Sequence, residues 1–432
     1  MPRTALSLSL PMLALLAALA PGPAALPAAA GEGPLAVRPV RHAPAPAPEP
    51  PAGGLIAPGI CPHDAPGCTF ERVFGTSQDD KAYGVLALDD GGLVAVGNTR
   101  RSNDTDYDAW MVRFSPRGAV VWERGFRGRD ADQAYGVAQT ADGGIVMAGH
   151  TRSRGQGASD GWAVKLSPAG ETLWQRTYGG PGNDRVRGLA ALPGGGVALA
   201  GFTASTPQGD RDVWVLRLDD AGAVQWQRRF GGPGLDSAFS VAALPDGGLA
   251  VAGQLWAGDD RGLSLWVLRL APDGALHWEA TADLARFGAA TAVAAHPDGG
   301  VAVAGAAGVD GTLSDDLWLA RYADDGAALW TRRLGGAGRD TPWGLGVTAA
   351  GDLQVAAISW SGGRGGGDAW ILGVDGADGA VLWERRYGGA AWDRPTGLLP
   401  LPTGPLVFGH TSSSGAGYED AWLLKLDPEG RL

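Results

Sequence analysis

Acidic side chains that could do chemistry recur along the chain at two fixed positions. One aspartate comes just before a short apolar run, and the other stands two residues before a tryptophan. The first set is Asp80, Asp132, Asp184, Asp236, Asp340 and Asp393, and the second is Asp108, Asp160, Asp212, Asp316, Asp368 and Asp420. If the fold gathers them, they could bind cations or a cationic ligand, or act as acid and base. The alternative is that each carboxylate accepts backbone N–H bonds in a glycine loop. The recurrence of these aspartates in six units favours this alternative, because a residue needed for the structure of each unit is repeated along the chain, whereas a functional site is usually not.

The segment Asn103 to Asp108 is the best local candidate for a metal site. Asp104, Asp106 and Asp108 alternate along it, and alternating carboxylates on a loop can wrap Ca²⁺. The glycine and the distal glutamate of a full calcium loop are absent, and a solvated acidic loop is the competing interpretation. The segment therefore suggests Ca²⁺ as a bound ion, and no cofactor is expected.

Histidines and catalytic motifs give little support for an enzyme. His150 and His410 occupy the same place in two repeat units, so a general-base pair is conceivable. A Ser-His-Asp arrangement cannot be assembled from spacing, and no nucleophile elbow, phosphate loop or dinucleotide fingerprint is found in a strand–helix context.

Aromatic residues outside the repeat pattern are the best candidates for a ligand site. Trp256, Trp343, Trp360 and Trp392 stand outside the regular tryptophan series, and the position equivalent to Trp343 is occupied by Tyr83, Tyr135 and Phe239 in other units. Aromatic faces beside Asp and Arg could stack on sugars or aromatic ligands. Local loop packing is the alternative.

These residues must be positioned by a regular repeat. One tryptophan recurs seven times at a constant interval, and a second follows each of the first six shortly afterwards, as Trp122 follows Trp110. The first series is Trp110, Trp162, Trp214, Trp266, Trp318, Trp370 and Trp422. Each unit reads as four strands with period-2 alternation and glycine turns, for example 134–140, 144–151, 161–167 and 171–178.

Four-stranded units that cannot bury both faces alone are stabilised by radial stacking. We predict an all-β, seven-bladed β-propeller of four-stranded antiparallel blades. The last unit ends after its third strand, whereas Phe70–Gly75 matches the fourth strand of the others. An N-terminal strand should therefore complete the last blade and close the ring, since an open ring would leave two bare sheet edges.

The region from about 69 to 432 resembles bacterial and archaeal β-propeller repeat proteins, whose units read FGG…D…DGG…VAG.T.S…D.W…KLD..G...W. The pattern is clearest over Tyr178–Phe230 and Phe230–Trp278, and Asp375, Gly379 and Trp383 look like the tryptophan-docking motif of quinoprotein-type propellers. The resemblance implies the propeller fold and little about activity. A quinone-dependent dehydrogenase of that kind would need a calcium site, a catalytic aspartate and usually eight blades. This sequence has seven repeats and no matching pattern of site residues, so we do not expect it to bind a quinone cofactor.

Residues 1–58 are expected to lie outside the folded domain. Arg3 and the apolar residues 5–20 precede an Ala-x-Ala site at 28–30, which predicts a signal peptide over residues 1–30. Residues 31–58 are rich in Pro, Ala and Gly, which is typical of an extended spacer. The propeller then spans 59–432. Export favours a disulfide between Cys61 and Cys68, and a zinc site with His63 is the alternative.

Composition limits the partners. Glycine accounts for 71 of 432 residues, the 17 tryptophans are many, and the net charge is −11. An acidic chain disfavours nucleic acid and anionic membrane surfaces, and no stretch after the signal is long enough to span a bilayer. The loops after the second and the fourth strand of each unit are long and share one face of the disc, the long-loop face. We expect a secreted or periplasmic monomer that binds a protein or glycan ligand through this face. A carbohydrate-active enzyme with Asp/Glu catalysis at the channel mouth is the alternative, and a quinoprotein-like redox enzyme is a more remote one.

Overall fold

The computed structural model describes residues 38–39, 62, 64–65, 67–100, 106–258, 262–282, 287–308, 315–362 and 365–432. The expected signal peptide lies outside these residues, as does the expected spacer apart from the two-residue strand β1 (Arg38–Pro39), which pairs with β10. The division of the N-terminal segment into signal and spacer thus remains a prediction.

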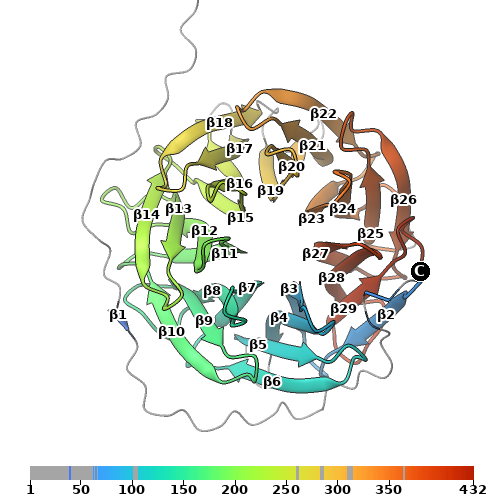
Figure 1. Cartoon of the computed structure of the whole chain (residues 1–432), viewed down its shortest axis with the longest axis horizontal. Helices are drawn as coiled ribbons and strands as arrows, with labels where there is room; N and C mark the ends of the chain where they lie inside the picture. Colours follow the sequence, from blue (N-terminus) through green and yellow to red (C-terminus); the bar gives the residue numbers. More distant parts are fainter. Residues whose placement is uncertain are drawn as a thin grey trace, which may run out of the picture.

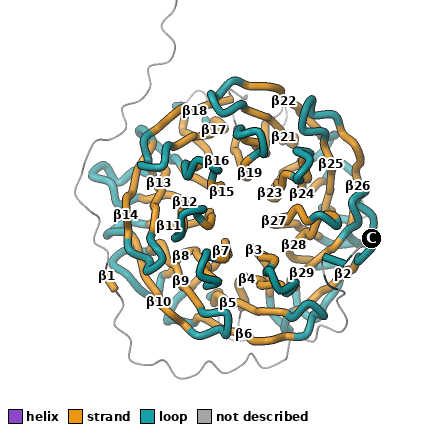
Figure 2. The backbone as a smooth tube through the Cα atoms, in the orientation of Figure 1, coloured by secondary structure: helices purple, strands orange, loops and turns teal. Residues whose placement is uncertain are grey.

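The repeat unit folds into seven antiparallel blades of four strands arranged as a propeller, and β1 adds a short fifth strand to the outer edge of the second (Figure 1, Figure 2). The described residues contain no helix. Six sheets follow chain order. Their strands are β3 (Asp80–Ala87), β4 (Leu93–Arg100), β5 (Tyr107–Phe114), β6 (Val120–Phe126); β7 (Asp132–Gln139), β8 (Ile145–Thr151), β9 (Asp160–Leu166), β10 (Thr172–Tyr178); β11 (Asp184–Ala191), β12 (Val197–Thr203), β13 (Asp212–Leu218), β14 (Val224–Phe230); β15 (Ser237–Ala243), β16 (Leu249–Trp256), β17 (Leu263–Leu270), β18 (Leu276–Ala282); β19 (Gly288–Ala295), β20 (Val301–Gly308), β21 (Asp315–Tyr322), β22 (Ala328–Leu334); and β23 (Asp340–Val347), β24 (Leu353–Ser359), β25 (Asp368–Val374), β26 (Val381–Tyr387). The prediction of an all-β, seven-bladed propeller is confirmed.

The seventh sheet joins the two ends of the folded region. It contains β27 (Asp393–Leu401), β28 (Gly404–Thr411) and β29 (Asp420–Lys425), and its outer strand is β2 (Phe70–Phe74). Phe70 pairs with Lys425 and Phe74 with Ala421. The Trp422 indole also donates a hydrogen bond of 2.9 Å to Glu71 Oε1, as the Trp266 indole does to Glu279 at 3.0 Å. These contacts give β2 the place that the fourth strand has in the other sheets.

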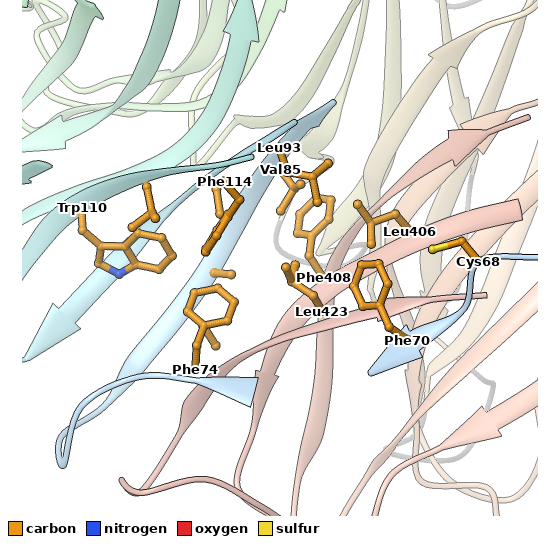
Figure 3. Packing of buried hydrophobic residues seen from close by; sticks show 14 residues of the cluster. Cys68, Phe70, Phe74, Val85, Leu93, Trp110, Phe114, Leu406, Phe408 and Leu423 are labelled. Carbon is orange, nitrogen blue, oxygen red and sulfur yellow. The ribbon is translucent and has the colours of Figure 1, made fainter. Parts of the chain in front are cut away.

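Hydrophobic clusters lie between neighbouring blades. One such cluster, between the seventh blade and the first, contains Phe70, Phe74, Trp110, Phe114 and Leu423 (Figure 3). The Phe74 ring meets Trp110 and Phe114 edge-on, with centroids 6.0 and 5.7 Å apart. Burial of such rings stabilises the contact between the two blades.

The second tryptophan series packs each of the first six blades against the next one. The indole of Trp122 donates to the carbonyl of Pro168 at 3.0 Å, and Trp226 does the same to Pro272 at 3.0 Å. The rings also lie against a turn glycine of the next blade. A Cβ on Gly170 would come within 2.9 Å of the Trp122 ring, so only glycine fits there. Trp174, Trp278 and Trp330 repeat the hydrogen bond.

Candidate functional site

The innermost strand of each blade carries a β-bulge at the same place. In the first blade Ala82 pairs with Gly97 and Gly84 with Val96, so Tyr83 is left without a partner in the ladder. A bulge redirects the extra side chain. The seven bulged residues all line a cavity of about 250 Å³ in the central channel. We call them the channel ring: Tyr83, Tyr135, Arg187, Phe239, Thr291, Trp343 and Thr396.

Aromatic contacts run along one side of the channel ring. The Tyr83 and Tyr135 rings meet edge-on with centroids 5.1 Å apart. Tyr135 stacks on His150 at 5.7 Å, and Tyr83 lies 6.2 Å from His410. Side chains from the seventh, first and second blades therefore form one continuous aromatic wall.

Two arginines complete this wall. The Arg187 guanidinium lies over both the Tyr135 and the Phe239 rings, 5.6 Å from each centroid. Arg394 lies over the Trp343 ring at 4.7 Å. Each contact places a cation against an aromatic face, where the ring quadrupole attracts it.

His150 and His410 are buried and neutral. Burial, together with the charges of Arg185, Arg187 and Arg152, lowers the pKa of His150 to about 3. Burial and the charges of Lys81 and Arg394 lower the pKa of His410 to about 3 as well. An efficient general base needs a pKa near the working pH, so this environment disfavours the general-base pair.

The other three predicted aromatic residues lie on loops or strand ends, and two of them form a pair. Trp360 and Trp392 meet edge-on at 6.1 Å and are 38% and 53% exposed. Trp256 ends β16 and packs over Gly234. The six predicted ligand residues therefore divide between the channel ring (Tyr83, Tyr135, Trp343) and this outer region, rather than forming one cluster.

The recurring aspartates are tied to the backbone and to hydroxyl groups. Asp184 accepts hydrogen bonds from Thr203 Oγ1, Ser205 Oγ and the Gly180 amide, and Asp393 accepts the corresponding three from Thr411, Ser413 and Gly389. These contacts support the interpretation that they hold the glycine loops in place.

Carboxylates from neighbouring strands also meet in pairs. A Cβ on Gly179 would lie 2.6 Å from Asp184 Oδ2 and 2.8 Å from Asp160 Oδ1, so the loop glycine leaves room for both. The same arrangement is found at Gly75, Gly231, Gly335 and Gly388. The pair at Gly388, Asp368 and Asp393, borders a cavity of about 820 Å³. Its repetition at other junctions indicates a structural role there too.

The predicted calcium and disulfide residues are described only in part. Asp104 and Cys61 lie outside the described residues, so both assignments remain predictions. Asp108 Oδ2 lies 3.8 Å from Arg127 Nε, and no group of three or more possible metal ligands occurs within the described ranges. Cys68 is buried and is not a free thiol. His63, the third residue of the alternative zinc site, is also outside those ranges.

Comparison with known proteins supports the fold alone. No family model matches the chain. A curated relative, a glutamyl-Q tRNA(Asp) synthetase from Synechococcus sp. (strain CC9605), is 32% identical over 123 residues. That match covers 26% of this chain and 37% of the synthetase, so it does not show the family.

Solved structures that resemble the chain include β-propellers. The quinohemoprotein alcohol dehydrogenase from Comamonas testosteroni superposes with a TM-score of 0.52 at 12% identity, covering 86% of this chain and 69% of that one. Sqt1 from Chaetomium thermophilum superposes with a TM-score of 0.47 at 15% identity, covering 82% of this chain and 83% of that one. The extracellular domain of BT4673 from B. thetaiotaomicron superposes with a TM-score of 0.46 at 11% identity, covering 84% of this chain and 43% of that one. Within the described part of the chain, no helix is long and apolar enough to cross a membrane.

Proposed function

We propose that this protein is an exported, non-catalytic binding module that holds its ligand at the channel ring, near the start of the innermost strands. One observation carries the proposal. Every blade repeats the bulge, but five different residue types occupy its seven positions: Tyr, Arg, Phe, Thr and Trp. The fold therefore needs the bulge and not the particular side chain, which leaves the aromatic and cationic groups available for recognition.

The environment of the acidic groups supports binding over acid–base catalysis. The aspartates accept hydrogen bonds from loop amides and hydroxyls, and they do so at several blade junctions. A catalytic pair of carboxyl groups would be expected at a single blade junction, with surroundings that differ from those of the repeated pairs.

A second observation favours a glycan as one class of ligand. Trp360 and Trp392 are exposed on loops of the sixth and seventh blades, and their rings lie edge-to-face. Exposed indole faces can stack on the apolar faces of sugar rings. The long-loop face could thus bind a glycan at this pair and a protein side chain at the channel ring.

Binding to defined glycan and peptide arrays tests the proposal. The variant Tyr83→Ala/Tyr135→Ala/Trp343→Ala should lose binding that the native protein shows. As a control, Val121→Ala/Leu173→Ala/Leu329→Ala truncates three apolar side chains that are 52 to 54% exposed on the outer strands, and it should keep that binding. Loss only in Trp360→Ala/Trp392→Ala would move the site to the outer pair. Turnover in a glycoside substrate screen with no array binding would contradict the proposal.

A further inference from the structure

Four basic side chains of the second and third blades gather beside the channel ring. Arg185 and Arg187 lie on β11, Arg152 follows β8, and Arg211 precedes β13. Burial lowers the pKa of Arg211, and the charges of Arg185 and Arg187 lower it further. Burial also lowers the pKa of Arg185, with added lowering by Arg187 and Arg152. These guanidinium groups therefore lie close enough to repel one another.

Elsewhere the chain neutralises its buried arginines. Arg269 is 3% exposed and lies 2.7 Å from Asp246 and 3.2 Å from Asp324. Arg321 is 2% exposed and lies 2.5 Å from Asp298. Pairing of this kind is the rule for buried charge, because an unpaired ion is costly to take out of water.

The arginines beside the channel are half-buried or, at Arg152, exposed, and among the described residues they lack this pairing. In the described part of the chain, no carboxylate forms an ion pair with Arg185, Arg187 or Arg211, although the whole chain carries a net charge of −11. The Arg185 Nε donates to Asn183 Oδ1 at 3.2 Å, which is a neutral acceptor. The positive charge here is therefore not neutralised by any described carboxylate.

The geometry of Arg187 indicates what a ligand must offer. Its guanidinium lies over two aromatic rings, and none of the described residues accepts a hydrogen bond from it. A guanidinium held in this way keeps N–H donors along its edge, where they match the two oxygens of a carboxylate or a phosphate. The surrounding rings suit an apolar or aromatic carrier.

We propose that the channel ring binds its ligand through an anionic group, a carboxylate or a phosphate, that pairs with Arg187 and is attracted by Arg185 and Arg211. This inference rests on the proposed function, since it names the chemistry of a ligand for the same ring. It goes beyond that function because it assigns the main recognition energy to one arginine.

Calorimetric titration at constant ionic strength tests the inference with three probes: benzoate, phenyl phosphate and the uncharged benzyl alcohol. The native protein should bind at least one of the two anions, and Arg187→Gln should weaken that binding at least tenfold. Arg187→Lys, which keeps the charge but not the planar fork, should retain part of it. The control Arg117→Gln makes the same charge change at an exposed turn of the first blade and should bind like the native protein. Thermal unfolding of each variant without probe shows that it is folded.

The outcomes separate this inference from the proposed function. Equal binding of the anions by native protein and Arg187→Gln, or no anion binding at all, would overturn the anionic ligand. If benzyl alcohol then binds and the Tyr83, Tyr135 and Trp343 variant abolishes that binding, the channel ring remains the ligand site. Stronger binding of phenyl phosphate than of benzoate would assign a phosphate, and the reverse a carboxylate.

Discussion

At the scale of single residues, the same aspartate position meets different surroundings from blade to blade. Asp160 accepts hydrogen bonds from the Gln156 and Gly157 amides, at 3.0 and 3.2 Å. Asp212 is its equivalent in the next blade, but no described residue donates a hydrogen bond to its carboxylate. Burial, with the charge of Asp210, raises the pKa of Asp212 to about 6, although the charge of Arg229 opposes the shift. The native protein therefore keeps a poorly compensated charge there at neutral pH.

We expect Asp212→Asn to stabilise the protein at pH 7. A carboxyl whose folded pKa is raised from 3.8 to about 6 stabilises the fold below pH 3.8, and that contribution is lost as the pH rises through 6. The amide cannot ionise, so the variant should gain about 1 kcal/mol over the native protein between pH 4 and pH 7, after allowance for solvent screening. Urea unfolding across this pH range measures the difference. The exposed turn variant Asp273→Asn should show no such gain, and an unchanged pH dependence in Asp212→Asn would contradict the prediction.

Sequence reasoning found the aromatic members of the channel ring but missed the cation. Tyr83, Tyr135 and Trp343 stand out in the sequence as large aromatic residues, whereas Arg187 has the appearance of an ordinary charged residue on a strand. Alignment of the repeats would have identified Arg187, because it lies one repeat length after Tyr135 and so occupies the equivalent position. The surroundings of Arg187 depend on tertiary contacts, which the sequence pattern does not reveal. No spacing rule shows that Arg187 lies between two rings without a carboxylate.

At the scale of the element, the bulged inner strand sets how closely the blades approach. The residue after each bulge is small, and at Gly188 a Cβ would lie 2.9 Å from the Val241 amide nitrogen. Because backbone atoms cannot move aside as a flexible side chain can, the inner rim of the ring has no room for a methyl group at this point.

Gly188→Ala should destabilise the protein by about 1–3 kcal/mol, which is typical of overpacking against rigid surroundings. Gly194→Ala is the matched control, because a Cβ at Gly194 meets no atom within 4 Å. It should be neutral or slightly stabilising through the unfolded state. Chemical unfolding of the two variants gives the comparison, and equal stability of both would show that the inner rim can relax.

The strands could be predicted from sequence where hydrophobic residues alternate regularly. The β-bulges, where strand pairing is irregular, could not. Evenly spaced tryptophans and glycine turns indicated four strands per unit, and the sheets have that number. The bulge inserts one residue into a short strand, and this leaves alternation intact on both sides. A short strand such as DKAYGVLA shows no sign of where pairing skips Tyr83.

At the scale of the whole molecule, the seventh blade is built from both ends of the folded region. Its inner three strands come from the C-terminal repeat, and β2, from the opposite end of the propeller sequence, supplies the outer strand. Glu71 accepts the Trp422 indole hydrogen bond, and Phe74 packs on rings of the first blade. The sequence predicted this strand by its match to the others, and its role in keeping the ring closed can be tested by removing it.

A chain that begins at residue 75 should be much less stable than one that begins at residue 59. The shorter chain loses two phenylalanines that are each 6% exposed, and each such loss typically costs about 3–5 kcal/mol. It also exposes the edge of β29, which favours self-association. Thermal unfolding and light scattering after size exclusion measure the two effects. Because the shorter chain could fail to fold, Phe74→Ala in the longer chain gives a second measurement, with an expected cost in the same range, and Val121→Ala on an outer strand is its neutral control. Equal melting temperatures and a monomeric state for both chains would mean that the ring stays closed without β2.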